Sequence, residues 1–386
     1  MRVAIITENF LPKLDGVTRT LAKLLEHLQL TGHPTMLLGP DSGMEQYAGA
    51  EIVGTAGLPF PFYPELKFNF FRPLFMRRLA EFRPDIIHLV DPVILGATGL
   101  AAARFFNVPL VSSYHTNLAA YCEHFGFSLL TRPMWSYNRF VHNQCVMTFC
   151  PSPSTAAMLR LEGFEHLRIW PRGVDTTLFR PERRSEELRT SWLQGQAEDK
   201  VILLYVGRVS WEKNLRLLVQ AYRRMNSQQC HLVIVGEGPA SVEMQQELMG
   251  LPVTFTGYLT GEALATAYAS ADVFAFPSRT ETFGQVVLEA MASGLPVVGL
   301  VAEGVCDLVD NEKTGLLIDD RRLQGEEQVA EYRKQLECLV QDRQKRLEMS
   351  NAALMEAQRR SWYEAMECLV RGYQEVIEAT RPLVAA

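Results

Sequence analysis

Residues 278–298 read SRTETFGQVVLEAMASGLPVV, and short apolar runs at 272–276 and 295–299 flank the central part of this stretch. Continuous apolar runs of this length are typical of parallel strands that are buried on both faces. The residues between the two runs have the composition of a helix. A helix between two parallel strands makes a βαβ unit, so we expect an α/β domain here.

Signals for the ends of that helix are present in the sequence. Thr282 and Gln285 have the spacing of a capping box, which predicts that the helix begins at Thr282. Gly294 is typical of the position just past a helix end, and Pro296 cannot continue the helix.

Two glutamates accompany the predicted helix. Glu281 precedes it, close to the N–H groups at the positive end of the helix dipole, where a phosphate is also stabilised. Glu289 lies inside an otherwise apolar helix, where a carboxylate is costly to bury without a partner. A ligand with several hydroxyls and a phosphate suits this pair. Spacing alone favours the simpler interpretation, in which Glu281 is a surface loop residue and Glu289 is a buried glutamate with a neighbouring partner.

The full sequence of residues 278–298 closely resembles the donor-sugar motif of family 4 retaining glycosyltransferases, which have the GT-B fold. In that family the glutamate matching Glu281 contacts hydroxyls of the transferred sugar. The backbone at Phe283 and Gly284 lies against the sugar and the phosphate, and the glutamate matching Glu289 holds the nucleotide ribose. The resemblance implies two Rossmann-like, doubly wound domains that face a central cleft.

Composition limits the possible functions. A chain of 386 residues exceeds what one core usually serves, so we expect two domains. A net charge of -6 argues against nucleic acid as a partner, because binding to phosphate backbones requires clustered Lys and Arg. The seven cysteines are scattered and lack metal-site spacing, which is typical of reduced cysteines in a cytoplasmic protein. No apolar run is long enough to span a bilayer.

The first half of the chain alternates apolar runs with helical patterns, which predicts a doubly wound domain with ligands at the carboxyl ends of its strands. The run 2–7 is followed by a loop and by a helical pattern from about Gly16. By the resemblance, residues 12–16 are the glycine loop that faces the donor phosphate and the acceptor. Asp15 replaces the first of two glycines found in many members. A tight turn would explain the same residues.

His115 follows the predicted strand 108–112. A lone His is more often structural than catalytic, but this one is expected at the carboxyl end of a strand. In the resembled family a histidine here hydrogen-bonds the donor sugar. Aromatic residues are frequent in 58–75 and are followed by Arg77 and Arg78. Either they belong to the core, or they form an interface for a membrane or a lipid acceptor.

The second half begins after 170–181, which matches the family's crossing between domains. Strand 201–206 leads to Arg208 and Lys213, which are either surface charges or a cationic clamp on the leaving diphosphate. Their surroundings match the family's diphosphate site, so we favour the clamp. Helix 362–386 is expected to return to the first domain, giving domains at 1–175 plus 362–386 and at 176–361.

The resemblance assigns the remaining donor-binding positions. They are Gly16, Gly207, Gly236, Tyr258, Leu259, Phe283, Gly284, Gln285, Leu288 and Glu289. Tyr258 and Leu259 would meet the nucleobase. The catalytic set is His115, Arg208, Lys213 and Glu281. No Asp-x-Asp motif stands beside them, so neither a metal nor another cofactor is expected.

The chain looks most like GDP-mannose-dependent α-mannosyltransferases, and next like sulfoquinovosyldiacylglycerol synthases. This likeness predicts retaining transfer of a hexose from a nucleotide sugar to a hydroxyl of a lipid or other small amphiphilic acceptor. The preferred hexose is mannose, with GDP-mannose as the donor. Peripheral contact with a membrane is compatible with such an acceptor. Three alternatives stay open: a UDP-sugar donor, a nucleotide-sugar 2-epimerase, and a non-catalytic nucleotide-sugar binding protein.

Overall fold

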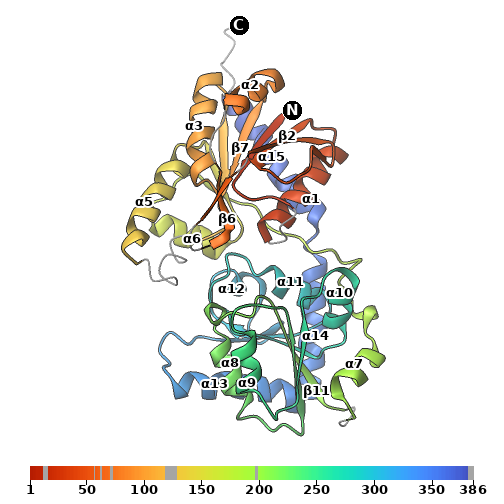
Figure 1. Ribbon diagram of the computed structural model, residues 1–386. Helices are drawn as coiled ribbons and strands as arrows, with labels where there is room; N and C mark the ends of the chain where they lie inside the picture. The colour runs from red at the N-terminus through yellow and green to blue at the C-terminus, as the bar shows by residue number, and fades with distance from the viewer. Residues whose placement is uncertain are drawn as a thin grey trace. The chain divides into compact units, whose positions relative to one another are not determined.

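The computed structural model describes the backbone of residues 1–11, 16–55, 57–60, 63–69, 73–117, 128–195 and 199–380. The chain divides into two compact units (Figure 1). Unit 1 consists of Met1–Arg172 together with Trp362–Ala386, and unit 2 consists of Gly173–Ser361. The change of unit therefore falls between Arg172 and Gly173, slightly before the position expected from the sequence.

Unit 1 contains an eight-stranded sheet in its described part, with the order β10-β9-β8-β7-β1-β2-β4-β3. Neighbouring strands are parallel except β3 and β4. The strands are β1 (Val3–Thr7), β2 (Thr35–Pro40), β3 (Gln46–Tyr47), β4 (Ala50–Thr55), β7 (Ile86–Val90), β8 (Leu110–Ser113), β9 (Met147–Cys150) and β10 (Leu167–Ile169). The strand order reverses between β1 and β7, and ligands of such sheets bind at that switch point.

Helices cover both faces of this sheet (Figure 1). They are α1 (Gly16–Leu30), α2 (Pro73–Phe82), α3 (Ile94–Phe106), α5 (Ser128–Asn143), α6 (Pro153–Leu161) and α15 (Trp362–Thr380). Successive residues of β1 point to opposite faces. Val3 and Ile5 pack with residues of α1 and α15, whereas Ala4 and Ile6 pack with residues of α2 and α3. A separate ribbon of β5 (Gly57–Phe60) and β6 (Tyr63–Asn69) is antiparallel.

Unit 2 contains six parallel strands in the order β13-β12-β11-β14-β15-β16. They are β11 (Val201–Val206), β12 (Cys230–Val235), β13 (Val253–Gly257), β14 (Val273–Phe276), β15 (Val297–Leu300) and β16 (Gly315–Ile318). All six residues of β11 are buried, as the apolar run predicts. Burial of each such side chain contributes about 1.5–3 kcal/mol. The order reverses between β11 and β14, so the predicted α/β class with two doubly wound sheets is confirmed.

The helices of unit 2 lie before, between and after these strands in the sequence. They are α7 (Glu186–Leu193), α8 (Leu215–Tyr222), α9 (Ser241–Glu247), α10 (Gly261–Ala269), α11 (Gln285–Ala292), α12 (Val305–Leu308), α13 (Glu326–Gln341) and α14 (Arg343–Gln358). The predicted start of α11 at Thr282 is wrong. Gly284 has φ 86° and is the residue before the first helical turn, because this left-handed conformation cannot belong to a right-handed helix. Gly294, with φ 80°, follows the helix as predicted.

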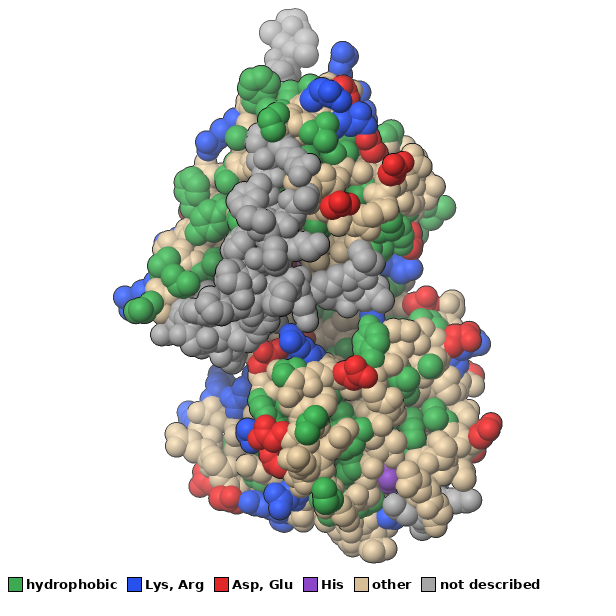
Figure 2. Space-filling view, in the orientation of Figure 1, with side chains coloured by type: hydrophobic (Ala, Val, Ile, Leu, Met, Phe, Trp, Pro, Cys, Tyr) green, Lys and Arg blue, Asp and Glu red, His purple; other side chains and the backbone are tan. Residues whose placement is uncertain are grey.

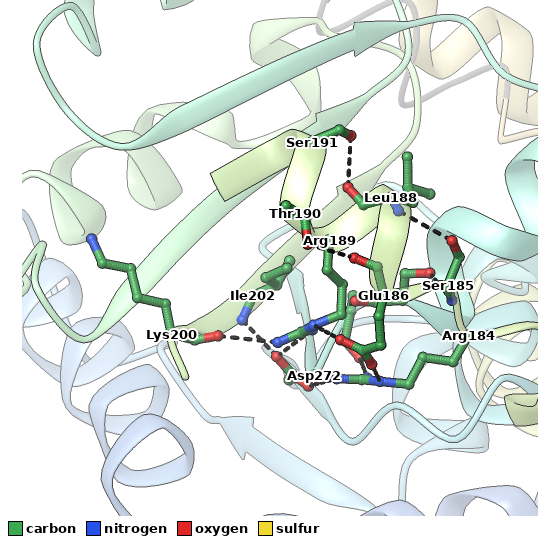
Figure 3. A network of polar contacts seen from close by, with 12 residues as sticks. Arg184, Ser185, Glu186, Leu188, Arg189, Thr190, Ser191, Lys200, Ile202 and Asp272 are labelled. Atoms are coloured by element: carbon green, nitrogen blue, oxygen red, sulfur yellow. Dashed lines mark hydrogen bonds and ion pairs between the residues drawn. The ribbon is translucent and has the colours of Figure 1, made fainter. Parts of the chain in front are cut away.

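A buried ion-pair network fastens α7 to the amino ends of β11 and β14 (Figure 3). Arg189 donates to Asp272 at 2.9 Å and to the carbonyl oxygens of Ser270 and Lys200. Asp272 also accepts from the amide of Ile202 at 2.8 Å. These residues lie at the edge of the sheet opposite to the carboxyl ends of its strands. They therefore stabilise unit 2 without entering the candidate site.

Candidate functional site

The candidate site of unit 2 forms at the carboxyl ends of β11 and β14. The two strands are neighbours, and the strand order reverses between them. The loop 207–214 leaves β11, and the loop 277–284 leaves β14. Because all strands of the sheet are parallel, both loops emerge at the same edge. Two segments that are far apart in the sequence are thereby brought together.

Lys213 and Glu281 form an ion pair between these loops. Nζ of Lys213 lies 2.7 Å from Oε1 of Glu281, and the side chains are 16% and 19% exposed. Nζ of Lys213 also lies 3.5 Å from the hydroxyl of Thr280. The buried hydroxyl of Ser278 donates to the same carboxylate oxygen at 3.0 Å. A cation and a carboxylate thus stand side by side, each within reach of a ligand that carries both phosphate and hydroxyl groups.

The loop that carries Glu281 is also held from its other side. Arg279 forms an ion pair with Asp320, which follows β16 and is 4% exposed. The side-chain amide nitrogen Nε2 of Gln328 donates to Oδ2 of Asp320 at 2.6 Å. Gly304 packs so closely that an added Cβ would lie 2.7 Å from the backbone of Phe283. These contacts restrain the loop, and the sequence did not single out Arg279 or Asp320.

The glycines after β11 and β12 allow their loops to approach each other. Gly207 has φ 154° and Gly236 has φ 127°. A Cβ at Gly236 would lie 2.0 Å from the carbonyl oxygen of Gly207, which no side chain could tolerate. The backbones of the loops after β11 and β12 therefore lie in direct contact at these two glycines.

Helix α11 begins at the same edge. Its first position is preceded by Gly284, which has no side chain with which to cap the helix. Gln285 donates to the carbonyl oxygen of Gly173 at 3.1 Å. Glu289 is 3% exposed and accepts a hydrogen bond from the hydroxyl of Tyr268 at 3.3 Å, which provides the polar partner that its burial requires. Leu288 is fully buried, so its side chain belongs to the core.

Two of three further predicted residues are exposed at this edge. Arg208 is exposed directly after Gly207, and none of the described residues forms an ion pair with its guanidinium. Tyr258 is 56% exposed after β13, and Leu259 is partly buried against the core. Their positions suit contacts with a flat ligand group.

The corresponding edge of unit 1 carries Glu8 after β1, Asp91 after β7 and His115 after β8. Oδ1 of Asp91 accepts from the amide of His115 at 2.7 Å, and its other oxygen accepts from the hydroxyl of Thr116 at 2.6 Å. Oε1 of Glu8 accepts from the amides of Val93 and Leu95 at the start of α3. Burial raises the pKa of Glu8 to about 7, although these amides lower it. The sequence analysis missed Glu8 and Asp91, although Glu8 directly follows the apolar run 2–7.

His115 is 8% exposed, and both of its ring nitrogens have partners. Nε2 lies 2.8 Å from the hydroxyl of Ser113, and Nδ1 lies 3.1 Å from a guanidinium nitrogen of Arg172. Arg172 was not singled out from the sequence. Gly16 begins α1 and is exposed.

Other sequence-based hypotheses are only partly covered by the structure. Residues 12–15 of the glycine loop lie outside the described residues, as do the side chains of 57–72. Phe75, from the aromatic stretch 58–75, is buried in the core of unit 1. Among the described residues no group of His, Cys, Asp and Glu has the arrangement of a metal site. No helix of this part is long and apolar enough to cross a membrane.

Models of two protein families match the chain. Residues 14–178 match the model described as glycosyltransferase family 4, and residues 189–354 match the model of group 1 glycosyl transferases. The two matches fall on opposite sides of the boundary between the units, except for the first residues of unit 2.

Characterised relatives cover most of the chain. A GDP-mannose-dependent alpha-mannosyltransferase of Mycolicibacterium smegmatis is 39% identical over 83% of this chain and 84% of the relative. A protein of the same name from Corynebacterium glutamicum is 35% identical over 98% of this chain and 89% of the relative. Sulfoquinovosyl transferase SQD2 of Arabidopsis thaliana is 34% identical over 91% of this chain and 69% of the relative.

Solved structures agree at the level of the fold. Sucrose-phosphate synthase from Thermosynechococcus elongatus superposes with a TM-score of 0.78 at 20% identity, over 98% of this chain and 99% of that chain. Anabaena HepE in complex with UDP and glucose superposes with a TM-score of 0.75 at 19% identity, over 97% of this chain and 100% of that chain. Such neighbours identify the GT-B fold. Together with the family matches, they confirm the resemblance inferred from residues 278–298: the chain belongs to the family 4 glycosyltransferases and is a hexosyltransferase.

Proposed function

We propose that this enzyme transfers mannose from GDP-mannose to a hydroxyl of a lipid acceptor, with retention of the anomeric configuration. The Lys213–Glu281 pair at the switch point of unit 2 is the observation that carries the proposal. It offers a cation for the diphosphate and a carboxylate for sugar hydroxyls within one small region. The donor itself is inferred from relatives that are 35% and 39% identical and are named GDP-mannose-dependent.

We assign the roles of the donor-binding residues from the family resemblance, and their positions support this assignment. Lys213 and the exposed Arg208 neutralise the leaving diphosphate, and Glu281 orients the sugar. Glu289 holds the ribose, and Tyr258 lies against the base. The backbone N–H groups at the start of α11 add a partial positive charge for phosphate oxygens. Because cationic side chains supply the neutralisation, we propose that the reaction requires no metal or other cofactor.

The transfer is a substitution at the anomeric carbon. The bond from that carbon to the diphosphate oxygen breaks, and a bond to the acceptor oxygen forms on the same face. The proton of the acceptor hydroxyl goes to the departing diphosphate. The protein contributes by positioning both substrates and by stabilising the charge that develops on the leaving group.

A lipid acceptor is supported by relatives and by the surface of α5. An alpha-monoglucosyldiacylglycerol synthase of Streptococcus pneumoniae is 27% identical over 82% of this chain. Leu129 on α5 is 91% exposed and Phe140 is 57% exposed, with the exposed Arg132 and Arg139 on the same side of the helix. Hydrophobic and basic side chains gather over α5 in Figure 2. Such a face suits peripheral contact with an anionic membrane surface.

A UDP-sugar donor, which the sequence analysis left open, is the second candidate. The transferred group could then be sulfoquinovosyl, because sulfoquinovosyl transferase SQD2 is 34% identical over 91% of this chain. A screen of GDP-, UDP- and ADP-sugars, with and without vesicles that contain diacylglycerol and glycosyldiacylglycerols, separates the possibilities. We expect hexosyl lipid from GDP-mannose. Product formed from UDP-sugars would show that the donor is a UDP-sugar and not GDP-mannose. A C2-epimer formed without acceptor would indicate an epimerase. Binding of nucleotide sugars without turnover would contradict the proposal that the protein is a transferase.

Membrane contact is tested by flotation with anionic vesicles. The double variant Leu129→Ser/Phe140→Ser should lose binding, because it removes the apolar part of the face. Met249→Ser is the matched control, since Met249 is 79% exposed but belongs to unit 2. Equal flotation of the double variant and the wild type would contradict a role of α5.

A further inference from the structure

A continuous chain of buried polar groups runs through unit 1 from Arg172 to α15. Arg172 reaches Nδ1 of His115, and Nε2 of His115 reaches the hydroxyl of Ser113, which lies 2.8 Å from Nε2 of His88. Nδ1 of His88 lies 2.6 Å from the hydroxyl of Tyr373 on α15. The sequence analysis singled out His115 alone among these residues.

Arg172 is held firmly in its position. It is 5% exposed, and one guanidinium nitrogen donates to the carbonyl oxygen of Trp170 at 2.7 Å. The guanidinium carbon lies 4.2 Å from the centre of the Trp170 ring, which adds a cation–π contact. The other terminal nitrogen is the one that meets His115 at 3.1 Å.

The direction of the contact between Arg172 and His115 follows from chemistry. A guanidinium has donors and no acceptor, so Nδ1 of His115 must accept and cannot carry a proton. The neutral ring then carries its proton on Nε2, which donates to Ser113. The position of a histidine proton is set by the hydrogen bond that the other ring nitrogen makes.

We propose that Arg172 is a positioning residue that fixes His115 in its neutral form with the proton on Nε2. The Nε2–H group of His115 is therefore a hydrogen-bond donor, and the ring is neither a general acid nor a general base. In the ligand-free protein this group donates to the hydroxyl of Ser113 at 2.8 Å. The assignment of the proton rests on unit 1 alone, whereas its use in catalysis rests on the proposed transfer reaction.

The surroundings of the ring agree with a neutral imidazole. Burial lowers the pKa of His115 well below its ordinary value, and the charge of Arg172 lowers it further. The ring of Trp170 packs edge-on against the ring of His115, with centroids 5.5 Å apart. Asp91 accepts from the backbone amide of His115 at 2.7 Å.

The proton position can be measured by long-range proton–nitrogen NMR of protein labelled at its histidines, with His115→Gln to assign the signal. We expect the wild type to show an unprotonated Nδ1 and a protonated Nε2. Arg172→Lys keeps a donor and should keep this pattern. Arg172→Met removes the donor and should allow the other tautomer or protonation of the ring.

Ser113→Ala is a second variant whose result does not depend on the folding of Arg172→Met. It removes the acceptor for Nε2 and leaves Arg172 in place, so the proton should stay on Nε2. A proton on Nδ1 in the wild type would overturn the proposal, and so would a switch of tautomer in Ser113→Ala. Unchanged signals in folded Arg172→Met would equally overturn it.

Kinetics supply a readout that a purely structural role would not produce. Turnover of Arg172→Met at saturating donor should fall roughly 10²-fold, because a misplaced contact near the reacting centre has this effect. Arg172→Lys should recover most of the loss, and binding of free nucleoside diphosphate by unit 2 should stay unchanged. A wild type with the expected tautomer but no transfer activity would contradict the proposed function and leave the tautomer assignment intact.

Discussion

Replacement of Glu281 by Gln should make the protein bind free nucleoside diphosphate more tightly while it slows the reaction. In the ligand-free structure the ammonium group of Lys213 is paired with the carboxylate of Glu281. A diphosphate must compete with this carboxylate for the same cation. Gln has nearly the same shape but no charge, so the variant releases Lys213 for the ligand.

The size of the effect follows from the distance of 2.7 Å between the charged atoms. Coulomb's law gives ~6 kcal/mol at an effective dielectric constant of ~20 and ~1.5 kcal/mol at ~80. The side chains are mostly buried, and the desolvation of the pair offsets part of this attraction. We therefore expect a net gain of about 1–2 kcal/mol in diphosphate binding, which is roughly 5- to 30-fold in affinity.

Calorimetric titration with GDP and UDP measures this gain, and the same protein is assayed for transfer. Turnover should fall about 10²-fold or more, because the contact of Glu281 with the sugar strengthens in the transition state. Glu281→Gln in a Lys213→Met background is the control, and there the gain in affinity should vanish. Unchanged or weaker diphosphate binding in Glu281→Gln would refute the reasoning, as would an equal gain in the Lys213→Met background.

Three further predictions concern other parts of the molecule. Glu289→Gln should weaken the nucleotide and the nucleotide sugar alike by roughly 1–3 kcal/mol, which titration with both ligands measures; a loss for the sugar nucleotide alone would contradict the ribose contact. Arg189→Met removes one of the two arginine partners of Asp272, which keeps its ion pair with Arg184. It should reduce the free energy of unfolding by about 1.5–3 kcal/mol in urea titration, the range for a hydrogen bond to a charged group, with diphosphate affinity of the folded protein unchanged. The pKa of Glu8 is raised by burial to about 7, so the native state binds more protons than the unfolded state between about pH 4.5 and 7. Stability should therefore fall as pH rises through this window, and melting curves of Glu8→Gln should lack that fall.

Much of unit 2 could be predicted from the sequence because local and tertiary signals agree there. The run 201–206 forms a fully buried strand, and residues 286–292 form a helix between two strands. The exact start of that helix could not be predicted from the sequence, because Thr282 and Gln285 have the spacing of a capping box although the helix does not begin at Thr282. The left-handed conformation of Gly284 decides the start instead, and it depends on how the loop packs.

The candidate site, like the fold, could be predicted only in part from the sequence. Glu281 and Lys213 were both recognised, but their direct pairing depends on the adjacency of β11 and β14, which no local pattern encodes. Arg172 was missed because it lies 57 positions from His115 along the chain. Contacts between buried polar residues that are far apart in the sequence can be identified only once the order of the strands in the sheet is known.

The most direct test of the account follows the reaction of EDTA-treated enzyme with GDP-mannose and lipid vesicles by NMR. The account predicts that an α-linked mannosyl lipid accumulates without added metal, in step with the release of GDP. Formation of a β-linked product, or activity that returns only after magnesium or manganese is added, would contradict it.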